Sequence, residues 1–197
     1  MVGVVRISGR ALSLGRRWFS HTTQFGAALS KEAKPVVLGG GAASPAAAET
    51  FRAWHAALSH SLAGDSSAGM NLVRPHMHSA CVFRPPTYFK PWVGRDETLC
   101  VLGAVAEVFG PSFRYGRQWL SDDGREWALE FSADIGASGK TLHGMDLVSL
   151  DTEGQIIEFT VLARPTNAIE ALKSEMILRV PVRMATLKAK QALGLVG

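Results

Sequence analysis

The sequence predicts an α+β domain in which helices come first and an antiparallel sheet follows. In the first half, apolar residues recur at helical spacing in two segments, 45–62 and 96–109. From residue 113 to residue 163, apolar and polar residues alternate, and short turn signals separate the alternating segments. These two halves pack most simply as a strongly curved antiparallel sheet wrapped on about three helices.

Composition limits the classes of protein and partner. The 197 residues are 47% hydrophobic and 19% charged, which is typical of one globular domain with tails. The net charge of +4 comes from the two ends, with four basic residues in the first twenty and four in the last twenty. No basic stripe crosses the middle and no apolar run is long enough to span a bilayer, so we expect neither nucleic-acid binding nor a transmembrane helix.

The first 30 residues have the composition of a mitochondrial presequence. No acidic residue precedes Glu32, and arginines alternate with serines and apolar residues. The membrane potential draws a cationic segment inward, and acidic residues would oppose it. We therefore expect a mitochondrial protein, with a basic tail of no targeting role as the alternative.

Residues 31–45 are predicted to be a linker, because their glycines, alanines and prolines have little to bury. Ser44 and Pro45 then open a helix as cap and first-turn residue. Its apolar stripe consists of Phe51, Trp54, His55, Leu58 and Leu62. A short helix is expected near residues 70–73.

A short strand, 79–84, is predicted to stop at Pro85-Pro86, because proline cannot donate to a strand ladder. An aromatic loop, 87–94, separates this strand from the helix of residues 96–109.

The remaining strands are predicted from alternation. Phe113, Tyr115, Arg117 and Trp119 are placed on one face of the first strand, and the next strand runs from Trp127 to Ile135. Strands 142–150 and 156–163 form a hairpin around the turn 151–154. If Leu150 pairs with Gln155, Asp146 lies opposite Phe159. A last helix from Thr166 is expected to break at Pro181, which leaves residues 179–197 as a basic amphipathic tail.

Four segments of residues 46–178 resemble the nuclear transport factor 2-like superfamily, which includes SnoaL-like polyketide cyclases and ketosteroid isomerase. The segments are FRAWHAAL, CVFRPP, VGRDETLCVLGAV and HGMDLVSLDTEGQIIEFTVLARP. The resemblance implies a cone-shaped fold that encloses a pocket. Because members include enzymes, carriers and non-catalytic proteins, it does not by itself define a function.

Asp146 and His55 are the candidate catalytic residues. Asp146 stands in mid-strand among apolar residues, where desolvation should raise its pKa, and a neutral acid can donate a hydrogen bond to a developing oxyanion. The resemblance implies the same role for Asp146, since an acid at the matching position of ketosteroid isomerase donates this hydrogen bond. It also places His55 near the position of the isomerase's oxyanion-hole tyrosine. The alternatives are a structural aspartate and a core histidine. The expected ligand pocket consists of Phe51, Trp54, Phe83, Val148 and Phe159.

One departure weakens the enzyme hypothesis. Pro85 occupies the place of the isomerase's general base, and proline cannot abstract a proton. The two cysteines, Cys81 and Cys100, have no metal-ligand spacing, and no dinucleotide or P-loop motif occurs, so no metal and no cofactor are expected.

Two functions therefore remain. The favoured one is a non-catalytic accessory or scaffold subunit of a mitochondrial, inner-membrane-associated complex, and the alternative is a SnoaL-like small-molecule enzyme or carrier that uses Asp146 and His55. The expected partners are other protein subunits, or a second copy bound through the outer sheet face, with peripheral membrane association. Met145, Leu147, Ile156 and Leu162 are assigned to that face. A filled pocket would favour the subunit, whereas an open apolar cavity with Asp146 in its floor would favour the enzyme.

Overall fold

The computed structural model describes residues 34–38 and 42–195. The predicted presequence, residues 1–30, lies outside them. Among the described residues, no helix is long and apolar enough to cross a membrane.

A mixed seven-stranded sheet forms one layer of the described chain, in the order β1-β4-β5-β6-β7-β2-β3. Its strands are β1 (Val36–Val37), β2 (Met77–Arg84), β3 (Trp92–Val93), β4 (Arg114–Leu120), β5 (Glu126–Asp134), β6 (Thr141–Leu150) and β7 (Ile156–Arg164). The α-helices are α2 (Pro45–Leu62), α3 (Ser66–Val73), α4 (Arg95–Phe109) and α5 (Thr166–Ala192). β4 to β7 form the predicted antiparallel meander, while β1 and β2 pair in parallel with β4 and β7.

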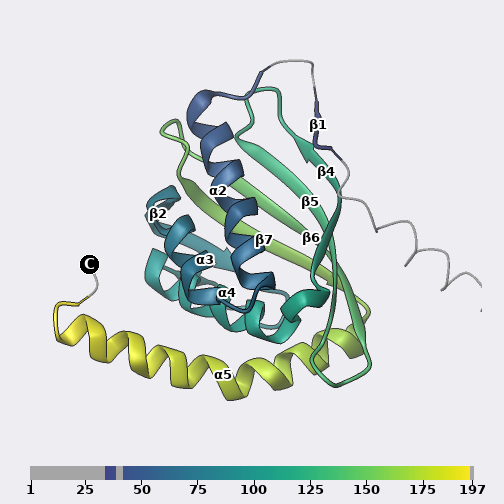
Figure 1. Ribbon diagram of the computed structural model, residues 1–197, viewed down its shortest axis with the longest axis vertical. Coiled ribbons are helices and arrows are strands. Elements are labelled where there is room, and N and C mark those ends of the chain that lie inside the picture. The colour runs from purple at the N-terminus through teal and green to yellow at the C-terminus, as the bar shows by residue number, and fades with distance from the viewer. Residues whose placement is uncertain (1–33, 39–41, 196–197) are drawn as a thin grey trace, which may run out of the picture.

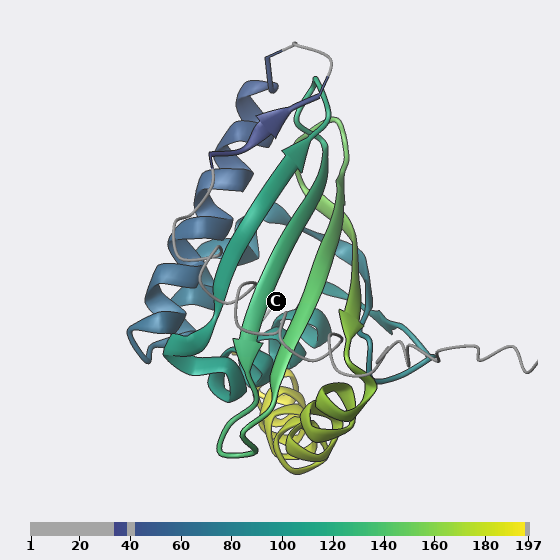
Figure 2. The same ribbon diagram turned by 90° about the vertical axis from the view of Figure 1, so that its right-hand side faces the viewer.

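The sheet curves around α2, α3 and α4, and α5 crosses the wide end of the resulting cone (Figure 1). Its other face is turned outward and is seen in Figure 2. The predicted inward row of β5 is confirmed, because Trp127, Leu129, Phe131 and Ala133 are all at most 2% exposed. The fold class predicted from the sequence, an α+β cone, is therefore correct.

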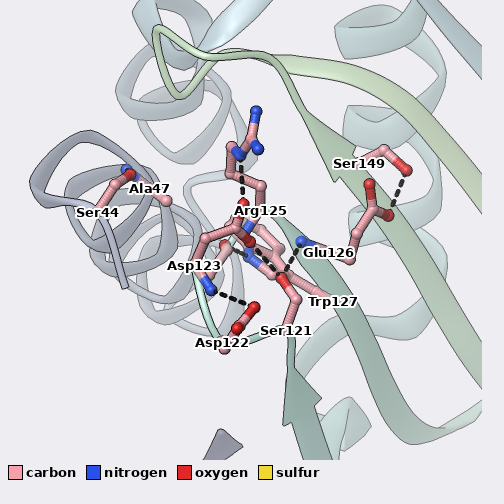
Figure 3. Close-up of polar contacts among 10 residues, drawn as sticks. Ser44, Ala47, Ser121, Asp122, Asp123, Arg125, Glu126, Trp127 and Ser149 are labelled. Carbon is pink, nitrogen blue, oxygen red and sulfur yellow. Dashed lines mark hydrogen bonds and ion pairs between the residues drawn. The ribbon is translucent and has the colours of Figure 1, made fainter. Parts of the chain in front are cut away.

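The β4–β5 turn holds the start of α2 against the sheet (Figure 3). The side chain of Ser44 accepts a hydrogen bond from the Ala47 amide, and the Ser44 amide donates to the Asp123 carbonyl at 2.9 Å. The indole of Trp127 donates to the Gly124 carbonyl at 2.7 Å, and Gly124 has a positive φ of 75° that favours glycine. The predicted N-cap is thus anchored by a turn some eighty residues further along the chain.

Regular alternation fails on β4, where the structure corrects the predicted face. The pairing to β5 shifts between Tyr115 and Gln118, so β4 carries one extra residue. A bulge of this kind reverses the side-chain alternation beyond it. Tyr115 and Gln118 consequently point inward and are buried, whereas Arg117 is exposed.

The predicted register of the β6–β7 hairpin is also wrong. Leu150 pairs with Ile156, and Asp146 lies opposite Val161 instead of Phe159. The register shifts between Ser149 and Leu150, which places Ile156 in the core at 0% exposure. Ile156 therefore does not belong to the outer sheet face.

Two predicted boundaries also differ. The linker assigned to residues 31–45 includes strand β1, whose two valines pair with the end of β4. The last helix does not break at Pro181 but continues to Ala192, with a bend near its middle that Figure 1 shows. Packing explains the continuation, because Val180 is 7% exposed and the Arg183 guanidinium pairs with Glu107 on α4. These contacts offset the single backbone hydrogen bond that proline removes.

Candidate functional site

A cavity of about 120 Å³ lies between the helices and the concave face of the sheet. Its wall is almost entirely apolar and includes Leu58 of α2, Val105 of α4, Met176 of α5 and Phe159 of β7. A dry apolar cavity of about 150 Å³ takes one benzene ring, so this cavity has room for a molecule of about one ring. Its size and lining are those of a site for a small apolar molecule.

Asp146 is the only carboxylate among the described residues that line this cavity. Its neighbours across the sheet are Leu129 on β5 and Val161 on β7, and only 4% of the residue is exposed. Burial disfavours the charged form, and it raises the pKa of Asp146 from 3.8 to about 7, although a hydrogen bond from Tyr115 acts in the opposite direction. The expected desolvation of this acid is thus found in the structure.

Tyr115 links Asp146 to the first long helix. Its hydroxyl donates to Oδ2 of Asp146 at 2.9 Å and accepts from the indole nitrogen of Trp54 at 2.7 Å. Burial and the nearby carboxyl raise the pKa of Tyr115 well above its ordinary value, so the phenol stays protonated. Trp54, Tyr115 and Asp146 therefore form a hydrogen-bonded chain from α2 through β4 to β6.

The protonation state of Asp146 determines whether it donates a hydrogen bond to a ligand or accepts one. When Asp146 is ionised, the Tyr115 hydroxyl hydrogen forms the hydrogen bond between the two residues. The carboxylate can then only accept a hydrogen bond from a ligand. When Asp146 is neutral, the pair carries one more hydrogen, and no described residue forms a hydrogen bond with Oδ1. That hydrogen is available to an oxygen atom in the cavity. The site therefore changes from donor to acceptor as the pH rises through about 7.

His55 does not join Asp146. Its Nδ1 lies 3.0 Å from the Phe51 carbonyl oxygen, and its Nε2 lies 2.9 Å from the side-chain oxygen of Gln118. The bulge in β4 explains this partnership, because it turns Gln118 inward. Tyr115, which regular alternation placed on the same face as Arg117, makes the hydrogen bond with Asp146 instead.

Three of the five predicted pocket residues line the cavity: Trp54, Phe83 and Phe159. Phe51 and Val148 do not. The Phe51 ring packs edge-on against Trp127 at 5.1 Å, and Val148 is a buried residue between β5 and β7. Both stabilise the core beside the cavity.

Pro85 lies in the cavity wall, as expected from its place at the end of β2. A side chain there faces the same space as Asp146, yet proline has no group that takes a proton. Among residues 34–38 and 42–195, no cluster of three or more His, Cys, Asp or Glu side chains could hold a metal ion. Asp146 and Tyr115 are a hydrogen-bonded polar pair in the lining of this cavity.

Comparison with known proteins is informative mainly at the level of structure. No protein-family model matches the chain, and no curated protein matches it by sequence. A crystal structure of a steroid delta-isomerase from Pseudomonas aeruginosa is 33% identical over 73% of this chain and 97% of its own, with a TM-score of 0.62. An uncharacterized bacterial protein of cystatin-like fold from Silicibacter pomeroyi is also 33% identical over 75% of this chain and 94% of its own, with a TM-score of 0.59.

The curved sheet, the three covering helices and the cavity between them define a protein of the nuclear transport factor 2-like class. Since the alignment to the isomerase spans nearly all of that protein, the chain belongs to the nuclear transport factor 2-like superfamily, as a relative of the steroid delta-isomerase.

Proposed function

We propose that this protein binds a small, mostly apolar molecule that carries one oxygen atom, and that it holds this oxygen at Asp146 and Tyr115. The observation that carries the proposal is the single buried acid, with a pKa of about 7, in an otherwise apolar cavity. Apolar walls favour a ligand of hydrocarbon character, and one convergent polar pair fixes its orientation. Ketones of about one ring have this chemistry and this size.

Binding is favoured over isomerisation. Neutral Asp146 can donate to a carbonyl oxygen and stabilise negative charge that develops there. Removal of a proton next to the carbonyl needs a second group, and the position that faces the cavity at the end of β2 is Pro85. A carrier or a sensor of apolar ketones therefore fits the cavity better than a steroid isomerase does.

A matched pair of probes tests the proposal: acetophenone, which has a carbonyl group, and ethylbenzene, which has almost the same shape without it. Below the pKa of Asp146, titration calorimetry should show the ketone binding about fivefold more tightly, because one hydrogen bond contributes about 1 kcal/mol. Well above pH 7 this preference should fall, because the ionised acid no longer donates.

Two variants separate the donor from the cavity. Asp146→Leu should bind both probes alike, since the apolar walls remain and the donor is gone. Asp146→Asn should keep the preference and lose its pH dependence, because the amide donates at every pH. Failure of either probe to bind, or equal binding of both by the parent protein at low pH, would contradict the proposal.

A second function, that of an accessory subunit in a mitochondrial assembly, is supported by apolar side chains on the surface of the chain. Leu147 and Leu162 are 38% and 57% exposed. They occupy the outer face of β6 and β7, and Phe89 is fully exposed in the aromatic loop. Apolar groups gathered in this way favour a protein contact, with a second copy or with another subunit.

Import and assembly can be tested together in cells. A fusion of residues 1–35 should carry a passenger into mitochondria, and changing Arg6, Arg10, Arg16 and Arg17 to glutamate should abolish this. On native gels of mitochondrial extract, the full-length protein should migrate above the monomer, and Leu147→Ser with Leu162→Ser should return it to the monomer position. A cytosolic fusion, or a full-length protein that migrates as a monomer throughout, would rule out the accessory function.

A further inference from the structure

Helix α5 presents two apolar faces on opposite sides. Its inner face packs on the domain through Leu172, Met176 and Val180, which are at most 7% exposed. The opposite side carries a stripe of exposed apolar residues, here called the outer stripe of α5. Its members are Leu178, Pro181, Val182, Ala185, Ala189 and Leu193.

The outer stripe has the width of a membrane-facing helix surface. At 3.6 residues per turn, its members fall within about a third of the helix circumference. Leu178, Val182 and Leu193 are 70%, 67% and 72% exposed, so no described part of the chain covers them. In Figure 1, α5 lies along one end of the molecule, and its C-terminal half extends beyond α4.

Basic residues border the outer stripe on both sides. By helical geometry, Lys188 lies at one margin and Lys190 at the other, where Arg179 is paired with Glu175. Long basic side chains in these positions can rest along an apolar surface and extend their charges to the level of lipid headgroups. No acidic residue occurs from position 176 to position 195.

The charge of this helix end differs from that of the rest of the described chain. Residues 173–195 contain five basic residues and one acidic residue, whereas residues 34–172 contain eleven basic and fifteen acidic residues. The positive charge therefore gathers on the helix that bears the outer stripe. The outer stripe complements the acyl chains of an anionic bilayer, and the flanking cations complement its negatively charged headgroups.

We propose that the outer stripe of α5 lies on an anionic membrane surface, with its apolar residues at the level of the acyl chains. A second copy is the weaker occupant, because pairing two outer stripes would bring like charges together at both margins. The inner face of the same helix is part of the cavity wall. A molecule in the cavity would then be about one helix diameter, roughly 10 Å, from the bilayer.

Flotation of the full-length protein with lipid vesicles tests this surface. The protein should float with vesicles of equal parts phosphatidylcholine and phosphatidylserine, and much less with phosphatidylcholine alone. Leu178→Ser with Val182→Ser should lower partitioning by at least about tenfold, because two exposed aliphatic side chains leave the interface. Lys188→Gln with Lys190→Gln should lower it by about fivefold per charge, and high salt should weaken binding by the parent protein.

Matched controls use similar side chains elsewhere on the domain. Val36→Ser with Leu38→Ser changes exposed apolar residues at strand β1, and Arg52→Gln with Arg114→Gln removes two exposed charges. Neither control should alter flotation.

The proposal is overturned if the parent protein does not float, if it binds both vesicle types equally, or if the α5 variants float like the parent. The last result would place the lipid contact on another segment, such as the basic first 30 residues. A dimer in the absence of lipid that Leu178→Ser with Val182→Ser abolishes would also overturn it, in favour of a second copy.

Discussion

Asp146→Asn is expected to remove a pH-dependent loss of stability that the parent protein shows between about pH 4 and pH 7. The folded state raises the pKa of Asp146 from 3.8 to about 7, so folding favours the neutral acid. The parent therefore has the full stability of this buried group below about pH 4 and loses it as the pH rises through 7. With 1.36 kcal/mol per pKa unit, the loss is about 4 kcal/mol.

The quantity to measure is the difference in the free energy of unfolding between the parent protein and Asp146→Asn. Urea unfolding of parent and variant at matched pH values cancels all other titrating groups, and the variant should gain about 4 kcal/mol relative to the parent between pH 4 and pH 8. Asp134→Asn is the matched control, because Asp134 is an exposed residue at the end of β5 and its change should leave this difference flat. A constant difference between parent and Asp146→Asn would show that Asp146 is ionised in the folded state throughout this range.

Trp127→Asp is expected to unfold most of the protein at neutral pH. The Trp127 side chain is 2% exposed, packs against Phe51 and donates its indole hydrogen to the Gly124 carbonyl. Truncating a buried tryptophan costs about 3–5 kcal/mol, and an unpaired buried carboxylate adds to this cost. The sum approaches the whole stability of an ordinary domain, which is about 5–15 kcal/mol.

Trp119→Asp is the matched control for this variant. Trp119 is a partly buried residue on the outer side of the sheet, where the Arg117 guanidinium lies 5.2 Å from its ring. An aspartate there stays in contact with water and next to a positive charge, so the cost should be about 1–2 kcal/mol. Circular dichroism melts of both variants check the expectation. Similar melting temperatures for the two would mean that the inward face of β5 is not the core.

Periodicity was sufficient to predict the elements but not how they pair. The alternation along β5 and the helical stripe of α2 survive in the structure because each element is regular from end to end. On β4, one extra residue reverses the alternation after Tyr115. A pattern of strict period two cannot contain that change, so it places Tyr115 and Gln118 on opposite faces. A separate irregularity, between Ser149 and Leu150 of the β6–β7 hairpin, puts Asp146 opposite Val161 instead of the predicted Phe159.

The candidate site shows the same limit. Asp146 could be predicted, because a carboxylic acid among apolar residues in mid-strand is conspicuous in the sequence. Tyr115 could not, since a tyrosine on an apolar strand face is ordinary in a core and its partner lies 31 residues away. Trp54 was predicted to line the pocket, but its hydrogen bond to Tyr115 depends on how α2 crosses the sheet. Such contacts between distant segments exist only after folding.

The ionisation of Asp146 with and without ligand is the most direct test of the central claim, namely that a neutral Asp146 holds an oxygen atom in the cavity. Carbon-13 NMR of the labelled carboxyl group can follow its titration. The account predicts a midpoint near 7 in the free protein, raised further by saturating acetophenone and much less by ethylbenzene, because the ketone binds the protonated acid. A midpoint near 4, or one that the ketone does not move, would contradict the account.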